Sequence, residues 1–462
     1  MSFHRGVPGD SSEDGYAVDP WATHSAADLD APPADDPGLS GLVRLTLLAI
    51  LGGAVTGLIG GVFRRLLAEA ERLRTSLLDW AREDALRWAV PVLLAAALVA
   101  LARYRVRLVP EAAGSGVQRV EAHIRGEVPA ARGVVLPVKF VGGLLSLGSG
   151  MVLGREGPTV QMGASVGGFV SRRAKVSTHD TRTLSVALAG AGLGVAFSAP
   201  LGGAMFVFEE VAHAFRTRLV VATLAATTTA LAVARYVVGA EPVLPVRGVD
   251  AGSTWLLLAY AVLGALLGAL GVLYNRVVVA MLDVAEAVKR LAPEVKAALV
   301  GAFVMAVGLA APWIIGGGDA LNEALLVSTP PLATLLAITV VRWFLGPLSY
   351  SVGTPGGLFA PLLVVGAAVG SLVAVASSSV APGLALSSTS FAVVGMSTFF
   401  AAVVRAPITG VVLIMEMTAQ TALVVPMVVA AAVAVVVATL LKGPPVYDTL
   451  RARMNRAAGA TA

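Results

Sequence analysis

Apolar segments follow one another almost without pause from about residue 41 to residue 441. Eight of them approach the ~20 residues that a helix needs to span a bilayer: 41–63, 87–103, 218–239, 254–280, 296–315, 329–349, 386–404 and 420–441. Six others are short or interrupted by glycine and proline, and we expect partial, tilted or half-membrane helices there: 133–152, 154–170, 184–198, 200–213, 355–377 and 407–418. The pattern predicts an all-α membrane protein with broken and tilted helices.

The composition strengthens this prediction and narrows the chemistry. Hydrophobic residues make up 56% of the 462 residues and charged residues only 14%, which excludes a soluble globular protein. Cysteine is absent, so disulfides, thiolate metal sites and cysteine nucleophiles are excluded. The five histidines show no paired ligand spacing, and we expect no metal and no cofactor. The net charge of +5 is spread over loops and the C-terminus, which indicates membrane orientation and not nucleic-acid binding.

The two ends of the chain differ from its middle. Residues 1–39 are acidic and rich in proline, serine and alanine, without the basic and apolar regions of a secretory signal peptide, and we expect a disordered cytoplasmic tail. The basic loop 103–107 and the basic residues after 441 favour cytoplasmic placement, although the loop 171–175 is also positive. The predicted organisation is this tail, a first membrane repeat, a linker, a second membrane repeat and a short cytoplasmic C-terminal tail: 1–39, 40–239, 240–253, 254–441 and 442–462.

The two predicted membrane repeats share spaced motifs. A pattern of Gly, Pro, Gly-Ala and Val-Gly around Pro158 returns around Pro361, at an offset of 203 residues (361 − 158). An Ala-Pro-x-x-Gly motif at Pro200, with Glu209 after it, returns at Pro407 with Glu416, at an offset of 207 (407 − 200). Duplicated halves with broken helices near the midplane are typical of a transporter with its site between the repeats. The offset alone leaves parallel and inverted arrangements open.

The stretch 154–163 contains the most informative charge in the apolar region. Pro158 suits the first turn of a helix, so the sequence predicts a helix that starts inside the membrane. Its unpaired N–H groups and its dipole favour an anion. Glu156 is a carboxylate at this position, and an intramembrane carboxylate is unfavourable unless it is functional or paired. Arg155 is one possible ion-pair partner, but adjacent residues on a helix do not face each other.

Three other irregular stretches offer donors to an anion, and each has a purely structural interpretation. Gly114-Ser115-Gly116 offers a hydroxyl and backbone amides, or simply a helix cap between turn glycines. The loop before Pro361 offers the N–H groups of Leu358 and Phe359, or a tight turn between packed helices. Tyr447 follows the last span and offers a hydroxyl, or anchors the membrane interface.

A pair of carboxylates, Glu209 and Glu210, ends the apolar run 201–208. Consecutive helical residues point about 100° apart, so at most one of the two faces a given pathway. Such a group is a candidate proton acceptor, and a hydrated helix end is the structural alternative. Glu416 has the same alternative and lacks a nearby anion-binding motif.

Together these stretches resemble the CLC family of chloride channels and proton-coupled chloride transporters. The resemblance covers about residues 41–450 and rests on Gly114-Ser115-Gly116, Gly154-Arg155-Glu156-Gly157-Pro158, Gly357-Leu358-Phe359-Ala360-Pro361 and Tyr447, in that order. It implies two inverted-topology repeats and a homodimer with a separate pore in each subunit, in a cell membrane, with the bacterial inner membrane and cytoplasmic termini as the expectation. No paired regulatory domains follow the last span, so nucleotide regulation is not expected.

The resemblance also implies roles for individual residues. The expected anion-binding residues are Ser115, Gly116, Arg155, Gly157, Leu358, Phe359 and Tyr447. Glu156 resembles the gating glutamate, Glu210 the internal proton-transfer glutamate of many exchangers, and Glu121 a carboxylate that supports it. One departure stands out, because Val117-Gln118 replaces the usual Ile-Pro. Gln118 puts the anion selectivity in question, although Ser115 favours chloride over nitrate and over fluoride.

These roles predict a proton-coupled chloride antiporter whose substrates are chloride and protons. A passive chloride channel of the same fold is the first alternative, and Glu210 argues against it. A transporter for nitrate or fluoride is the second. A membrane-embedded hydrolase using Ser115 is a third, but no histidine or lysine lies beside Ser115 in the sequence and the chain has no Gly-x-Ser-x-Gly motif. We therefore expect no enzymatic activity.

Overall fold

A computed structural model describes residues 38–246, 253–380 and 386–459. The predicted acidic tail lies outside the described residues except for its last two positions, and residues 247–252 of the predicted linker also lie outside them. The helices of the described part are α2 (Gly38–Arg82), η1 (Ala85–Trp88), α3 (Ala89–Leu108), η2 (Pro110–Ala112), α4 (Val117–Ile124), α5 (Val135–Gly148), α6 (Glu156–Ala174), α7 (Thr178–Phe197), α8 (Pro200–Phe206), η3 (Val207–Val211), α9 (Thr217–Val238), α10 (Leu256–Ala287), α11 (Pro293–Ala310), η4 (Pro312–Ile314), α12 (Asp319–Val327), α13 (Leu332–Ser351), α14 (Phe359–Val380), α15 (Ser388–Val404), α16 (Pro407–Thr418), α17 (Val424–Leu440) and α18 (Val446–Gly459).

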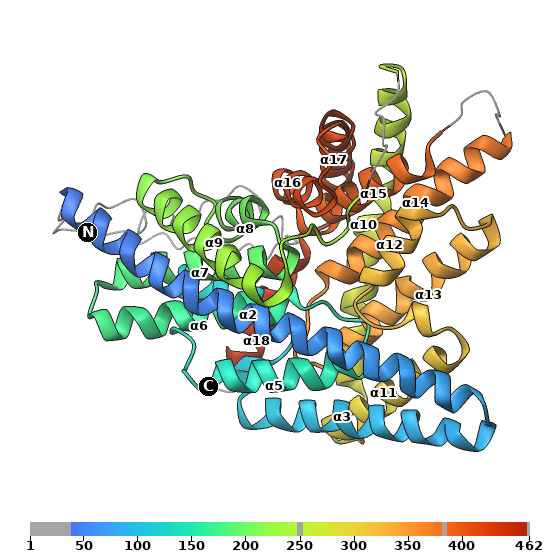
Figure 1. The fold of residues 1–462 in the computed structure, drawn as a ribbon, viewed down its shortest axis with the longest axis horizontal. Helices are drawn as coiled ribbons and strands as arrows, with labels where there is room; N and C mark the ends of the chain where they lie inside the picture. The colour runs from blue at the N-terminus through green and yellow to red at the C-terminus, as the bar shows by residue number, and fades with distance from the viewer. Residues whose placement is uncertain (1–37, 247–252, 381–385, 460–462) are drawn as a thin grey trace, which may run out of the picture. The chain divides into compact units, whose positions relative to one another are not determined.

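Helices account for nearly all of the regular structure, and the predicted all-α class is confirmed (Figure 1). Seven helical segments of the described part are long and apolar enough to cross a membrane: α2, η1 with α3, α9, α10, α11, α13 and α14. Two predicted spans are shorter than expected, because α15 and α17 have 17 residues each. Ser387 caps α15 and turn residues flank α17, and the sequence pattern had counted apolar loop residues such as Leu386 and Leu423 with them.

The helix in the segment 355–377 is longer than predicted. It was predicted to be a partial helix, yet α14 runs for 22 residues without a break. Its glycines do not interrupt it, because they allow a close approach to α15. A Cβ at Gly366 would lie 2.9 Å from the carbonyl carbon of Gly395, and one at Gly370 would lie 2.7 Å from that of Phe391. Small residues at such positions let two helix backbones pack in contact.

The first half of the chain contains an equivalent close pair, formed by α6 and α7. A Cβ at Gly163 would lie 2.8 Å from the carbonyl carbon of Leu188, and one at Gly167 would lie 2.5 Å from the Cα of Ser185. These two glycines are the sequence counterparts of Gly366 and Gly370, at the same offset of 203 residues (366 − 163). The repeated motif thus encodes one tightly packed helix pair in each half.

The two halves meet at an antiparallel bridge between two loops. The N–H of Gly154 donates to the carbonyl of Gly357 at 2.8 Å, and the N–H of Gly357 donates back to the carbonyl of Gly154 at 2.8 Å. This antiparallel bridge joins the loops that precede α6 and α14. The bridge thus holds the corresponding helix starts of the two repeats next to each other.

A second reciprocal contact joins the short helices α8 and α16. The carboxylate of Glu209 accepts hydrogen bonds from the N–H groups of Ile408 (3.0 Å) and Thr409 (2.6 Å) at the start of α16. The carboxylate of Glu416 accepts from the N–H groups of Leu201 (3.2 Å) and Gly202 (2.7 Å) at the start of α8. Each repeat thus caps a helix of the other, which accounts for the second sequence repeat.

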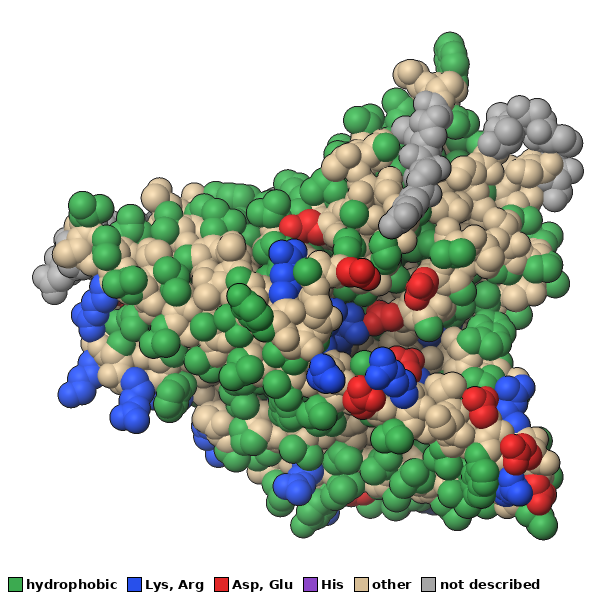
Figure 2. Space-filling model, in the orientation of Figure 1, with side chains coloured by type: hydrophobic (Ala, Val, Ile, Leu, Met, Phe, Trp, Pro, Cys, Tyr) green, Lys and Arg blue, Asp and Glu red, His purple; other side chains and the backbone are tan. Residues whose placement is uncertain are grey.

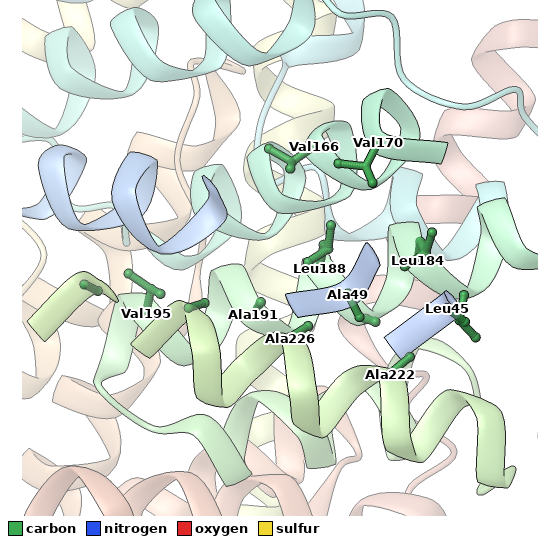
Figure 3. Close-up of a cluster of buried hydrophobic side chains, with 13 residues drawn as sticks. Leu45, Ala49, Val166, Val170, Leu184, Leu188, Ala191, Val195, Ala222 and Ala226 are labelled. Carbon is green, nitrogen blue, oxygen red and sulfur yellow. The ribbon is translucent and has the colours of Figure 1, made fainter. Parts of the chain in front are cut away.

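Small and branched apolar side chains fill the core of the first half. One cluster lies where α2, α6, α7 and α9 face one another, and its side chains point into the space between these helices (Figure 3). Its members include Leu45, Ala49, Val166, Val170, Leu184, Leu188, Ala191, Val195, Ala222 and Ala226. Hydrophobic side chains also cover much of the surface, while charged side chains gather near the middle of one face and along its margins (Figure 2). This distribution suits a body that lies in lipid.

Candidate anion site and proton-accepting groups

The starts of α6 and α14 lie next to each other because the Gly154–Gly357 bridge holds the loops before them together. α6 begins at Glu156 and α14 at Phe359, so both first turns present unpaired N–H groups close to the bridge. Pro158 lies in the first turn of α6, as the sequence predicted. Both helix starts are buried in protein, the environment in which irregular backbone persists at membrane depth.

The carboxylate of Glu156 binds the Phe359 N–H, a donor that the sequence predicted for an anion. Its Oε1 accepts a hydrogen bond from the N–H of Phe359 at 2.7 Å, whereas its Oε2 has no hydrogen-bond partner among the described residues. The side chain is fully buried. A Cβ on Gly154 or on Gly357 would collide with this carboxylate, so the carboxylate packs directly against the two bridge glycines. The ion pair with Arg155, which was the structural alternative, does not form, because Arg155 pairs with Asp319.

Arg155 points away from this carboxylate. Its guanidinium pairs with Asp319 at 2.6 Å, at the start of α12, and donates to the carbonyl of Ala196 at 2.8 Å. Arg64 donates to the neighbouring carbonyl of Val195 at 2.7 Å. The side chain of Arg155 is thus held by other groups, and its predicted role in anion binding remains a prediction.

Ser115 reaches the site from a third direction, in the loop between η2 and α4. Gly157 of α6 packs directly on this loop, because a Cβ there would lie 2.7 Å from the Ser115 hydroxyl and 2.8 Å from its Cα. Gly116 has a φ of 86°, a left-handed conformation that favours glycine, and caps the start of α4. The Ser115 hydroxyl is fully buried and has no hydrogen-bond partner among the described residues. It is a free donor beside the start of α6.

Tyr447 lies in the first turn of α18 and closes the group. Its ring packs on Phe359 with a centroid separation of 5.6 Å, and Phe359 also packs on Phe400 at 4.8 Å. The phenol is completely buried, and its hydroxyl has no hydrogen-bond partner in the described chain. It lies beside the Ser115 hydroxyl and is close enough to Glu156 and Glu210 to sense their charges. The predicted residues Ser115, Glu156, Gly157, Phe359 and Tyr447 therefore converge.

Glu210 and Glu121 form a second buried group. Glu210 lies in η3, a π-helical turn, and such turns often occur at functional sites. It is 7% exposed and interacts electrostatically with Glu121 of α4, which is 2% exposed and has one carboxylate oxygen without a partner in the described part. Asp448, one residue after Tyr447, contributes a third negative charge nearby. The neighbouring Glu209 points instead to α16, so only one of the two adjacent carboxylates faces inward, as predicted.

Sequence reasoning missed two residues that shape the site. The Nζ of Lys139, fully buried in α5, donates to the carbonyls of Ala112 (3.1 Å) and Gly114 (2.6 Å) and so fixes the Ser115 loop. The lysine inside the apolar run 133–152 could have been noticed in the sequence, because charged residues within a membrane segment usually have a functional role. Tyr350, near the end of α13, lies against the same loop, and no motif indicated it.

Most of the chain matches one known protein family. A family described as voltage gated chloride channel matches residues 98–439. The chain belongs to this family, the CLC proteins. Membership places it among ion-transport proteins and not among enzymes, as predicted.

Individual CLC relatives match over most of their length. The H(+)/Cl(-) exchange transporter ClcA of Vibrio cholerae serotype O1 is 37% identical over 414 residues, which cover 87% of this chain and 88% of that protein. The protein of the same name from Citrobacter koseri is 35% identical over 421 residues, 89% of each chain. Among solved structures, one described as a slow cyanobacterial Cl-/H+ antiporter has a TM-score of 0.86 at 32% identity and covers 89% of this chain and 98% of that one.

Proposed function

We propose that this CLC protein is a proton-coupled chloride antiporter in which Glu156 acts as the gate. The observation that carries the proposal is the hydrogen bond from the Phe359 N–H to the Glu156 carboxylate. A carboxylate on an anion-accepting donor competes directly with a permeating anion for that donor. The names of the relatives, which are exchange transporters, support the same assignment.

Chloride is recognised without a full countercharge. The hydroxyls of Ser115 and Tyr447 are buried, close together and without partners in the described chain, so both are available to donate to one anion. The first turns of α6 and α14 add backbone donors, among them those of Leu358 and Phe359. Helix starts and hydroxyls bind an anion by partial charges, which keeps binding reversible enough for transport.

Glu156 changes place during the transport cycle. In its ionised form it occupies the Phe359 N–H and closes the anion path. Coulomb repulsion between this carboxylate and a chloride at the hydroxyls favours the arrival of a proton on Glu156. The neutral side chain then leaves the donor, and an anion takes its place.

Glu210 supplies the proton from the other side of Tyr447. Both carboxylates lie within electrostatic range of the Tyr447 phenol, and the proposal requires water to carry the proton between them. Glu121 keeps a second carboxylate beside Glu210, and two such groups in one buried site hold a proton more readily than one does alone. Chloride and proton fluxes are coupled because both require Glu156 to move.

The assembly and the location follow from the same proposal. We infer a homodimer with one pore in each subunit, in a bacterial inner membrane, with both termini in the cytoplasm. The basic residues Arg103, Arg105 and Arg107 at the end of α3 favour this orientation.

Purified protein in liposomes with a chloride gradient tests the function. We expect chloride movement to drive protons uphill, measured with a pH electrode outside the vesicles. Chloride flux without proton movement would show a passive channel, and no flux would contradict both. Hydrolysis is not supported, because the Lys139 amine binds two carbonyls and has no hydrogen bond to Ser115.

A further inference from the structure

The segment that leads into Tyr447 is held by side chains that have no part in the proposed transport mechanism. Residues 443–447 have the sequence Gly-Pro-Pro-Val-Tyr and connect the end of α17 to the first turn of α18. Two consecutive prolines fix the backbone φ angles, so this connection is short and stiff. The position of the Tyr447 hydroxyl therefore depends on how the first residues of the segment are fixed.

Asn275, a buried residue of α10, binds the second residue of this segment. Its Nδ2 donates to the carbonyl of Pro444 at 3.1 Å and to the carbonyl of Val403, near the end of α15, also at 3.1 Å. A side-chain amide has two N–H donors, so both are used, each on a different part of the chain. The Oδ1 of Asn275 has no hydrogen-bond partner among the described residues. The contribution of Asn275 is therefore the bridge that its two donors make.

This bridge relates the segment to the aromatic rings at the anion site. Phe400 lies on α15, three residues before Val403, and its ring packs on Phe359 with a centroid separation of 4.8 Å. The ring of Phe359 in turn packs on that of Tyr447 at 5.6 Å. Asn275 thus ties the backbone before Tyr447 to the same helix whose Phe400 supports the ring contact.

The preceding carbonyl of the segment is held as well. A Cβ on Gly443 would lie 2.5 Å from a methyl carbon of Val272, which is one helical turn before Asn275, so α10 packs directly on the segment. The guanidinium of Arg405 donates to the Gly443 carbonyl at 2.7 Å and to the Val435 carbonyl of α17 at 2.9 Å. Two successive carbonyls of the segment are therefore fixed by two separate side chains.

We propose that Asn275 and Arg405 are positioning residues for chloride binding, which act by holding the Tyr447 hydroxyl against the anion. The inference rests on the proposed chloride transport and adds the residues that make one of its donors effective. A hydrogen bond weakens steeply when its geometry is disturbed. Because the segment is stiff, a shift of its backbone at Pro444 moves the hydroxyl away from the anion.

A double-mutant cycle tests this, with chloride affinity measured by calorimetric titration of the detergent-purified protein. Tyr447→Phe removes a hydrogen bond to a charged group, so it should weaken chloride binding by about tenfold or more. Asn275→Ala should weaken chloride binding by about threefold or more in the wild-type background, because the hydroxyl remains but is displaced. In the Tyr447→Phe background the same change should weaken binding by less than about twofold, because no hydroxyl is left to position.

Asn322→Ala is the matched control, since Asn322 is also a buried asparagine but lies in α12, outside this segment. It should leave the chloride affinity unchanged. If Asn275→Ala does not fold, Arg405→Lys takes its place in the cycle. A lysine keeps the charge but lacks the fork of donors with which arginine binds two carbonyls.

The proposal is overturned if the variant binds chloride as tightly as the wild type does. It is also overturned if the variant weakens binding by the same factor in both backgrounds, because a merely structural role does not depend on the Tyr447 hydroxyl. Failure of the wild type to bind chloride would instead contradict the proposed function.

Discussion

The starts of α6 and α14 are counterparts in the two repeats, yet they contribute opposite groups. The first supplies Glu156, a carboxylate, and the second supplies the N–H of Phe359, which binds that carboxylate at 2.7 Å. Their backbones are nearly equivalent, because Gly154 and Gly357 exchange hydrogen bonds of equal length. The comparison teaches that the repeats build two neighbouring helix ends, and that one residue difference between them places a carboxylate on a backbone donor, which is the arrangement the proposed gate requires.

Removal of the charge from the first helix should have the largest effect. Glu156→Ala makes the two helix starts chemically alike, so chloride should still cross but proton movement should be lost completely. Simultaneous chloride-electrode and pH-electrode recordings from liposomes measure both fluxes. Proton transport that persists in this variant would contradict the gating role.

Crowding of the carboxylate should have the next largest effect. The added methyl of Gly357→Ala would meet Glu156 Oε1 and lie 3.0 Å from the Gly157 nitrogen, so the flexible carboxylate should leave the Phe359 N–H. We expect chloride flux at neutral pH to rise by about threefold or more, since a hydrogen bond to a charged group is lost. Gly133→Ala is the control, because a Cβ there meets nothing within 4 Å. Unchanged flux in Gly357→Ala would contradict this seat for Glu156.

The reciprocal caps compare equivalent positions of the two repeats that differ by one hydrogen bond. Glu209 accepts from two N–H groups and from the Thr409 hydroxyl (2.7 Å), whereas Glu416 accepts from two N–H groups. Loss of a helix cap destabilises by about 0.5–2 kcal/mol. Glu209→Ala should therefore lower the thermal midpoint of unfolding more than Glu416→Ala does, as measured by fluorescence in detergent. The reverse order would show that the caps differ in some other way.

The smallest expected effect concerns a charge at the start of α7. Both α7 and its counterpart α15 begin with a serine cap, Ser177 and Ser387, but only α7 has an acidic residue in its first turn, Asp180. The nearby His179 ring and the charge of Arg218, which donates to the Asp180 carboxylate at 2.8 Å, lower the pKa of Asp180, although burial opposes them. A lowered folded-state pKa contributes stability above the unfolded value of about 3.9, and this stability is lost as the pH falls through the folded value.

Asp180→Asn should accordingly reduce stability slightly at pH 7 and make no difference at a pH well below 4. Thermal melts across this pH range, with the wild type in parallel, measure the gap. A gap that widened as the pH fell would contradict the sign of the shift.

Much of this fold was predictable from the sequence, because the breaks in its helices are marked by local glycine and proline motifs. Pro158 with its flanking glycines predicted the start of α6, and the repeat offsets predicted two homologous halves, in each of which the repeated glycines pack a helix pair. The lengths of α14, α15 and α17 were less predictable, because a glycine inside a helix and an apolar residue in a loop look alike in a hydropathy pattern.

The site residues that belong to a sequence motif were predicted. Those that reach the site only through tertiary contacts were missed. Ser115, Glu156, Phe359 and Tyr447 converge as expected. Lys139 binds carbonyls 25 and 27 residues before it, so its partners were invisible in the local sequence. The functions of Glu209 and Glu416 were likewise hidden, since each caps a helix about 200 residues away in the other repeat.

The most direct test of the gate is the position of bromide, which replaces chloride and is located by its anomalous scattering, in crystals of the wild type and of Glu156→Ala. The account predicts bromide near the Ser115 and Tyr447 hydroxyls in both crystals, and a further bromide at hydrogen-bonding distance from the Phe359 nitrogen only in the variant. Bromide on that nitrogen in the wild type, or none there in the variant, would contradict the claim that the carboxylate and the permeating anion compete for one donor.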